Sequence, residues 1–272
     1  PVISVSATDY LAGTTYVGSG VKSLIIYDDS GRAVASGIAS TSYTLADNYQ
    51  GTHTWTIIAT DNVGHTSSKT VTTRFDKTGP HCSSLVAIPN YWSAGNGTVS
   101  FTVQDAWAGL DYVILQRYSY VTRSWINVQT WYFNGTTSAV SRNYTETAEG
   151  VFYYRLYMSD VLGNTSTKDS DTIYLDHSNP VIHGVENTVT DWTNMAPTIS
   201  VSATDYLAGT TYNGSGLNSI VIKDDAGRTV ASGVSSTSYT LAARYEGIHT
   251  WYITATDNVG HTSSKSVTTK YD

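Results

Sequence analysis

The sequence predicts an all-β fold arranged as consecutive β-sandwiches, and three observations support this. Tyrosine is abundant, with 21 residues against 4 phenylalanines, and only 14% of residues are charged, a composition that suits strands better than helices. Short segments such as 3–8 alternate apolar and polar side chains, as half-buried strands do. As part of the same second observation, turn residues, such as those at 28–31, separate these segments.

The third observation is an internal repeat. The segment that begins at Pro1 recurs at Pro197, and the match runs without a gap to Asp76 and Asp272. Roughly three residues in four are identical, which marks a duplicated structural unit. A divergent third copy lies between the two, and its 159–164 segment corresponds to 60–65 of the first copy.

Two short linkers rich in turn residues, 76–80 and 176–180, set the unit boundaries. They give a period of about 100 residues, the usual size of an immunoglobulin-like β-sandwich. We therefore expect three tandem immunoglobulin-like sandwiches: a first unit (1–76), a middle unit (77–176) and a third unit (177–272). Pro1 aligns with Pro197 rather than Pro180, so we expect the chain to be a fragment whose first unit lacks its first strand and has an open sheet edge.

One motif carries a family resemblance. Ala7-Thr8-Asp9 is followed by Ser19-Gly20-Val21 and then by Ala59-Thr60-Asp61-Asn62-Val63-Gly64-His65, and versions recur in the other units. The pattern resembles the tandem bacterial Ig-like repeats of Gram-positive surface proteins and adhesins. That resemblance implies a role as a stalk or an adhesive module or, as in immunoglobulin-binding, superantigen-like members from gut bacteria, as a binder of host immunoglobulin.

The net charge and the cysteine content limit which partners and which location are expected. A net charge of −7 and a pI near 5.4 argue against nucleic-acid or anionic-membrane partners, which require basic patches. No apolar run approaches the roughly 18 residues of a membrane span. Cys82 is the single cysteine, so no intrachain disulfide framework exists. We expect a monomeric extracellular protein, on a bacterial surface or secreted.

In each unit, two aspartates are predicted to lie close together near a linker. Asp105 and Asp205 end one strand of their units, and Asp160 and Asp257 end another. In an immunoglobulin-like sandwich both strand ends face the preceding linker. Converging carboxylates suit Ca²⁺, which takes six to eight oxygen ligands, so a structural Ca²⁺ is one interpretation. The other is an Asx-turn, in which the carboxylate caps backbone N–H groups without a metal.

The middle unit differs from its neighbours on the outward side of two adjacent strands. There it carries tyrosines and an arginine where the first unit has, for example, Ser23, Thr56 and Ile58. Tryptophans follow on the next strand, with Trp131 and Tyr132 as possible extensions. Such residues are enriched at binding hot spots, whereas the alternative is that cross-strand tyrosine pairs only stabilise the sheet. We name this candidate ligand-binding surface the aromatic face: Tyr112, Ile114, Gln116, Tyr118, Tyr120, Trp125, Tyr153, Arg155 and Tyr157.

Motifs for catalysis do not emerge. The seven histidines are scattered, and neither a nucleophile elbow nor a phosphate-binding loop occurs. We therefore expect a non-enzymatic binding protein without an organic cofactor. The expected ligand is a host protein, most specifically an immunoglobulin. A glycan ligand and a passive stalk that displays a distal domain are the alternatives.

Overall fold

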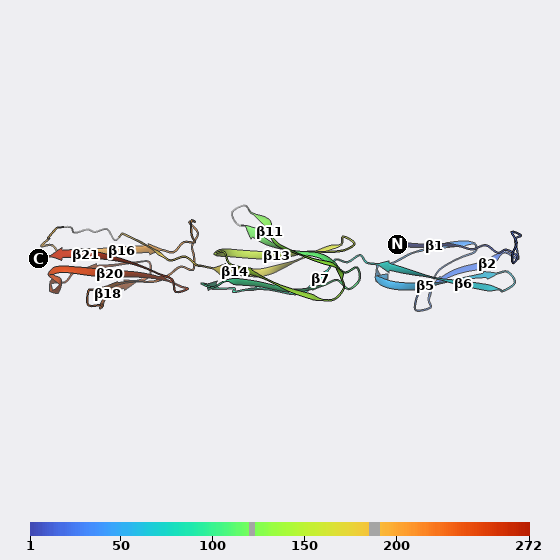
Figure 1. The fold of residues 1–272 in the computed structure, drawn as a ribbon, viewed down its shortest axis with the longest axis horizontal. Helices are drawn as coiled ribbons and strands as arrows, with labels where there is room; N and C mark the ends of the chain where they lie inside the picture. Colours follow the sequence, from blue (N-terminus) through green and yellow to red (C-terminus); the bar gives the residue numbers. More distant parts are fainter. Residues whose placement is uncertain (120–122, 185–190) are drawn as a thin grey trace.

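The computed structural model describes residues 1–119, 123–184 and 191–272 and confirms the all-β prediction. Six sheets form three pairs, and each pair encloses one cluster of buried side chains. The pairs follow one another in an extended row (Figure 1). The helical segments of the described residues are two short 3-10 turns, η1 (Asp47–Tyr49) and η2 (Ala243–Tyr245). In the same residues, no helix is long and apolar enough to cross a membrane.

The first unit packs a two-stranded sheet on a four-stranded one. Trp55 and Ile26 are fully buried between them, as the alternation of the sequence predicts. The strand orders are β1–β4 and β3–β2–β5–β6, with these bounds: β1 (Val2–Ser6), β2 (Val21–Tyr27), β3 (Ala33–Gly37), β4 (Ser40–Thr44), β5 (Gly51–Asp61) and β6 (Thr66–Phe75).

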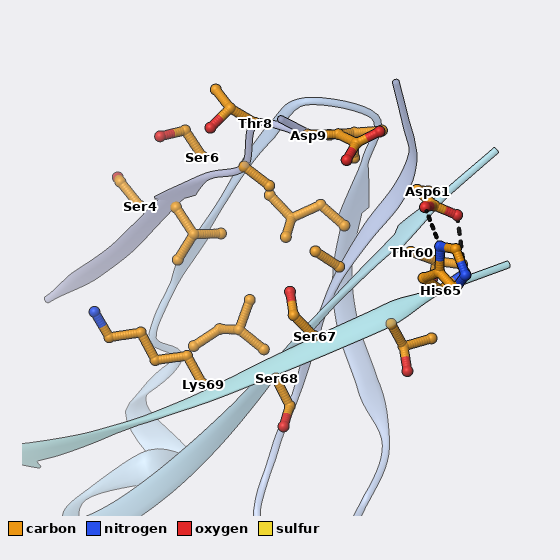
Figure 2. Close-up of a pocket in the computed structure, with 17 residues that line it drawn as sticks. Ser4, Ser6, Thr8, Asp9, Thr60, Asp61, His65, Ser67, Ser68 and Lys69 are labelled. Carbon is orange, nitrogen blue, oxygen red and sulfur yellow. Dashed lines mark hydrogen bonds and ion pairs between the residues drawn. The ribbon is translucent and has the colours of Figure 1, made fainter. Parts of the chain in front are cut away.

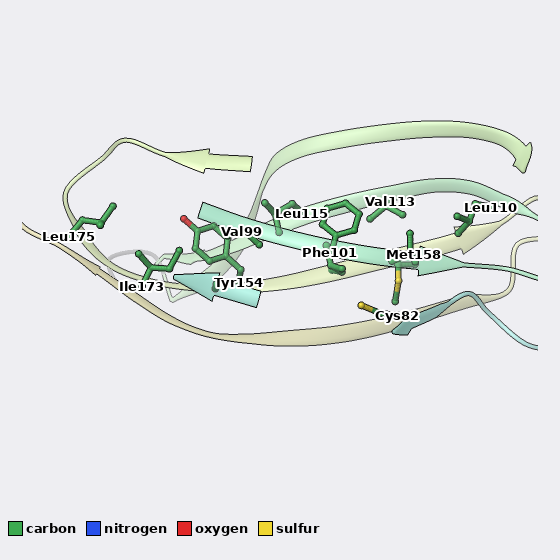
Figure 3. Packing of buried hydrophobic residues seen from close by; sticks show 13 residues of the cluster. Cys82, Val99, Phe101, Leu110, Val113, Leu115, Tyr154, Met158, Ile173 and Leu175 are labelled. Carbon is green, nitrogen blue, oxygen red and sulfur yellow. The ribbon is translucent and has the colours of Figure 1, made fainter. Parts of the chain in front are cut away.

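The middle unit packs a three-stranded sheet on a five-stranded one around Phe101, Leu115 and Tyr154 (Figure 3). The strand orders are β12–β9–β7 and β11–β10–β13–β14–β8. Their bounds are β7 (His81–Ile88), β8 (Trp92–Ser93), β9 (Gly97–Gln104), β10 (Leu110–Ser119), β11 (Ser124–Thr136), β12 (Val140–Glu146), β13 (Gly150–Asp160) and β14 (Thr165–Leu175).

The third unit repeats the first with one added strand, around a core that includes Trp251 and Ile220. The strand orders are β15–β16–β19 and β18–β17–β20–β21. Their bounds are β15 (Val181–His183), β16 (Thr198–Thr204), β17 (Leu217–Lys223), β18 (Thr229–Gly233), β19 (Ser236–Thr240), β20 (Gly247–Asp257) and β21 (Thr262–Tyr271).

The first unit has an open groove at the position that strand β15 occupies in the third unit. Beside β1 lies a groove of about 700 Å³, lined by backbone and side chains of β1, β5 and β6 (Figure 2). In the third unit β15 pairs with β16, Ile182 is only 3% exposed, and Lys265 Nζ donates to the Ile182 carbonyl. Val267 is therefore 5% exposed, whereas its counterpart Val71 is 37% exposed. Within residues 1–76, β1 pairs with β4 on one side, and its other edge has no strand partner.

Candidate functional site

The aromatic face lies on β10 and β13, which are antiparallel neighbours. Tyr118 pairs with Tyr153, Gln116 with Arg155 and Ile114 with Tyr157. The alternate residues of the same strands, such as Leu115 and Leu156, are fully buried, so the face residues point away from the core. Each of these face residues is half-buried, because neighbouring face side chains cover part of it.

Trp125 of β11 is the centre of one half of the face. Its ring lies 5.5 Å from that of Tyr118 and 5.6 Å from that of Tyr153. The Arg155 guanidinium carbon stands 4.2 Å from the Trp125 ring centroid, within cation–π range. Arg155 Nε and Nη2 also donate to Gln116 Oε1 at 3.0 and 2.8 Å, and Gln116 in turn donates to Asn127 at 2.9 Å. The arginine is therefore held in one orientation by neighbours on two other strands, β10 and β11.

The other half of the face is built from stacked tyrosines. Tyr112 and Tyr157 stack with ring centroids 6.3 Å apart, and Tyr132 lies 6.3 Å from Tyr112 on its other side. Tyr132 is 72% exposed, so this half presents a large aromatic surface to solvent. Tyr132 extends the face as one of the two expected additions.

Trp131 does not extend the face, and this expectation is wrong. It pairs with Val113, its ring lies 5.1 Å from that of Phe101, and it packs on the middle core. The reason is a bulge: Leu115 pairs with Gln129 but Gln116 with Asn127, so one extra residue of β11 inverts the alternation between Trp125 and Trp131. Tyr120 lies outside the described residues.

The flanking units carry other side chains at the same register positions. Thr56 and Ile58 of the first unit, and Tyr252 and Thr254 of the third, occupy the positions of Arg155 and Tyr157. Tyr252 is 53% exposed and stands as a single tyrosine there. The lattice of aromatic rings around an arginine therefore belongs to the middle unit.

The predicted aspartates do converge where units meet, together with the last aspartate of the preceding unit. At the first joint, ligand atoms of Asp76, Asp105 and Asp160 lie within 4.8 Å of one another, and all three residues are buried. Asp76 Oδ2 accepts a hydrogen bond from the Ala108 amide of the middle unit at 3.0 Å. Burial raises the pKa of the Asp105 carboxyl above 3.8, and the charges of Asp76 and Asp160 add to the increase.

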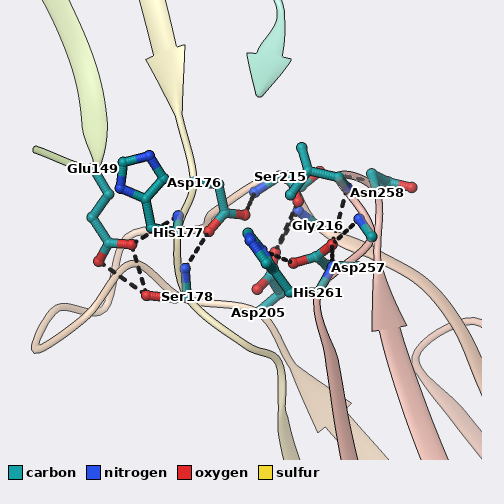
Figure 4. Close-up of polar contacts among 12 residues, drawn as sticks. Glu149, Asp176, His177, Ser178, Asp205, Ser215, Gly216, Asp257, Asn258 and His261 are labelled. Atoms are coloured by element: carbon teal, nitrogen blue, oxygen red, sulfur yellow. Dashed lines mark hydrogen bonds and ion pairs between the residues drawn. The ribbon is translucent and has the colours of Figure 1, made fainter. Parts of the chain in front are cut away.

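The second joint holds the equivalent aspartates, Asp176, Asp205 and Asp257, and all three are buried (Figure 4). Ligand atoms of Asp176, Asp257 and His261 lie within 4.8 Å of one another. Asp205 lies nearby, because Ser215 donates its amide hydrogen to Asp176 and its hydroxyl to Asp205. Burial raises the pKa of the Asp205 carboxyl, and the charges of Asp176 and Asp257 add to the increase. Glu149 of the middle unit spans the joint as well, because it accepts hydrogen bonds from Ser178 of the linker and from the Ala208 amide.

The Asx-turn interpretation also holds for part of this set. Asp160 Oδ1 accepts from the Leu162 and Asn164 amides at 2.8 and 2.9 Å. Asp257 Oδ1 accepts from three backbone amides of its turn in the same way. These aspartates therefore shape their turns. The second oxygen of Asp160 accepts from Asn164 Nδ2 at 2.7 Å, and that of Asp257 lies 2.9 Å from His261 Nδ1.

One buried network was not anticipated from the sequence. Glu146, 2% exposed at the end of β12, accepts from Arg117 Nη1 and from the Tyr154 hydroxyl, each at 2.7 Å. Burial raises the pKa of Tyr154 far above 10, and the contact with Glu146 adds to this. The network ties β12 of one sheet to β10 and β13 of the other. A signal could have been the lone glutamate in an otherwise alternating strand.

Comparison with known proteins gives structural similarity only. No family model matches the sequence, and no curated protein matches it. The chain resembles the tetra-tandem repeat from the extending region of a large adhesion protein at 19% identity, covering 93% of this chain and 67% of that one with a TM-score of 0.39. It also resembles a 1.5-MDa bacterial ice-binding adhesin at 14% identity, covering 100% and 91% of the chains with a TM-score of 0.31.

A third similar structure is the set of fibronectin(III)-like modules of Clostridium thermocellum CbhA. It is 14% identical, and the match covers 71% of this chain and 94% of that one with a TM-score of 0.27. All three TM-scores are below 0.5, so these similarities assign no function to this chain. Its function has to follow from its own side chains.

Proposed function

We propose that this chain is a non-catalytic binding segment of a bacterial surface or secreted protein, and that the aromatic face of the middle unit recognises a host protein. The supporting observation is the arginine-centred lattice of Trp125, Arg155 and Gln116 on an open sheet surface. The first unit (1–76) and the third unit (177–272) are proposed to hold and space this middle unit (77–176).

The lattice suits binding because its residues are ordered before a ligand arrives. Arg155 already has two hydrogen bonds and a ring contact, so it would lose little side-chain freedom on binding. Tyrosine and tryptophan bring large contact areas with two rotatable bonds each, which is why they dominate hot spots. The face therefore offers contact area at low entropic cost.

A protein ligand fits the shape of the face better than a sugar. The face is a sheet surface spread over β10, β11 and β13, and flat surfaces complement protein epitopes. An immunoglobulin is the specific host protein that we propose, on the strength of the resemblance to immunoglobulin-binding surface repeats. A glycan remains the second ligand class, since exposed rings such as Tyr132 can stack on sugars.

A passive stalk is the second candidate function. The three units follow one another in an extended row, and buried aspartates and Glu149 connect consecutive units. Such a chain could display a distal domain without binding anything itself. The two functions differ in one respect: a stalk does not need the aromatic face.

The test is a binding screen of the full chain against two matched variants. Purified immunoglobulin classes, a panel of serum and mucosal proteins, and a glycan array serve as probes. The first variant, Arg155→Thr with Tyr157→Ile, carries residue types found at the same positions of the flanking units. The second, Tyr252→Thr, removes the exposed tyrosine of the third unit and is the control.

We expect a host protein to bind the wild type and the control, and binding to fall at least about 100-fold in the first variant, as for hot-spot residues. Binding of glycans alone would contradict the protein ligand. Absence of binding to every probe would favour the stalk. Equal binding by all three chains would show that the face is not the site.

A further inference from the structure

The second joint contains a carboxylate oxygen that the protein itself does not satisfy. Asp205 is 5% exposed, and its Oδ1 is the one buried side-chain oxygen or nitrogen without a hydrogen-bond partner among the described residues. Its Oδ2 is held by the Gly216 amide at 2.7 Å. Because an unsatisfied buried carboxylate oxygen is costly, this atom points to a missing partner.

Neighbouring carboxylates make that partner a cation. Asp176 is fully buried and Asp257 is 1% exposed, and Figure 4 shows the Asp205 carboxylate between them. Ser215 hydrogen-bonds to two of these three carboxylates: its amide donates to Asp176 Oδ2 and its hydroxyl to Asp205 Oδ2. No lysine or arginine in the described part of the chain forms an ion pair with the three aspartates, and His261 pairs with Asp257 alone.

The loop that carries these contacts approaches the carboxylates unusually closely. A Cβ added to Gly214 would lie 2.6 Å from Asp176 Oδ2 and 3.0 Å from Asp205 Oδ2, so the backbone there admits glycine alone. In the first unit, a Cβ on the equivalent Gly18 would meet Asp9 only. At this joint the loop therefore brings Asp176 of the middle unit close to Asp205 of the third unit.

We infer that Asp176, Asp205 and Asp257 form a Ca²⁺ site that joins the middle and third units. Ca²⁺ takes six to eight oxygen ligands, and the three carboxylates would supply part of this set, with water completing it. Asp205 Oδ1 accepts no hydrogen bond, Asp176 Oδ1 accepts one from the Ser178 amide, and Asp257 Oδ2 has one contact, with His261. Each carboxylate therefore keeps an oxygen with a free lone pair. Asp176 follows β14 of the middle unit, whereas Asp205 follows β16 and Asp257 ends β20, so the ion connects one unit to the next and stiffens the joint.

The test measures Ca²⁺ bound to the chelator-treated full chain at pH 7 by calorimetry, with Asp205→Asn as the variant. The equivalent Asp9→Asn substitution in the first unit is the matched control, because Asp9 Oδ2 accepts from the Gly20 amide as Asp205 Oδ2 does from the Gly216 amide. We expect Asp205→Asn to lower the number of bound Ca²⁺ ions by one and Asp9→Asn to leave it unchanged. Far-UV circular dichroism checks that both variants fold.

A second measurement does not depend on any variant. At a hundredfold excess over its Kd, Ca²⁺ should raise the melting midpoint of the third unit by roughly 10 °C. The inference is overturned if millimolar Ca²⁺ gives neither heat nor a shift of the midpoint. It is also overturned if Asp205→Asn binds as many ions as the wild type, or if the joint binds Zn²⁺ alone and loses it on His261→Ala.

Discussion

The middle and third units bury similar cores but present different surfaces on the same sheet. In the middle unit, Arg155 and Tyr157 sit within a lattice of rings, whereas the third unit has Tyr252 and Thr254 at those positions. Both sheets nevertheless hold fully buried residues beneath, such as Leu156 and Ile253. The sandwich therefore folds with or without the aromatic lattice, and this favours a role in binding rather than folding.

The two units also differ in how polar groups seal the core. In the middle unit, Glu146 lies between sheets and pairs with Arg117, whose side chain is 23% exposed. In the third unit, Asp224 lies in a turn and pairs with Arg228, whose side chain is 66% exposed. A buried charge whose partner is also shielded from water depends more strongly on that partner. Loss of the charge pair should therefore lower the stability of the middle unit more than that of the third unit.

Removal of Glu146 should have the largest effect on stability. Glu146→Ala leaves Arg117 and the Tyr154 hydroxyl without their shared acceptor, and breaking such a pair costs about 3–5 kcal/mol of unfolding free energy. Cys82, the single cysteine and 8% exposed, lies in the middle core, so its labelling rate in urea reports the unfolding of this unit alone. The Asp224→Asn variant should leave that labelling rate unchanged. Unaltered labelling of Glu146→Ala would show that the network adds nothing.

A second substitution should make the third unit resemble the first. Ile182→Ala removes the apolar side chain by which β15 covers the core, at a cost of about 2–5 kcal/mol. Hydrogen exchange in β16 should then approach the exchange in β1, the equivalent strand beside the open groove of the first unit. If β16 stays as protected as before, the covering strand is not what distinguishes the two copies.

The smallest effect concerns pH. Hydrogen bonds from Tyr245 and Arg228 outweigh the cost of burial and hold the pKa of Asp224 at about 2, below its ordinary 3.8. A carboxyl with a lowered folded-state pKa stabilises the fold above 3.8 and loses that contribution as pH falls toward 2. The difference in melting midpoint between the wild type and Asp224→Asn should therefore shrink between pH 5 and about 2. A difference that is constant over this range would argue against the ionised network.

Much of the fold follows from local patterns, and the misses have physical reasons. The alternation of apolar and polar residues predicted which side chains point into the cores, such as Trp55 and Leu115, because strand side chains alternate with a period of two. It failed at Trp131, where a single bulge residue inverts the alternation. The Glu146 network was missed because its partners come from two other strands of the opposite sheet, a contact that no local pattern records.

The aspartates show the same division. Their positions at strand ends predicted that they converge at the joints, where Asp105 and Asp160 lie together with Asp76, and Asp257 lies together with Asp176. The sequence did not indicate that Asp205 keeps an unpartnered oxygen, since that depends on how closely Gly214 and the linker approach. Ca²⁺ binding stays a prediction.

The most direct test of the proposed function compares the affinity of one immobilised host protein, such as a polyclonal immunoglobulin, for three chains by surface plasmon resonance. The wild type and Tyr252→Thr should bind alike, and Arg155→Thr with Tyr157→Ile should bind at least about 100-fold more weakly. Cys82 labelling should confirm that the middle unit of each chain is still folded. Equal affinities of all three chains, with the fold intact, would contradict the proposal that the aromatic face is where this molecule meets its partner.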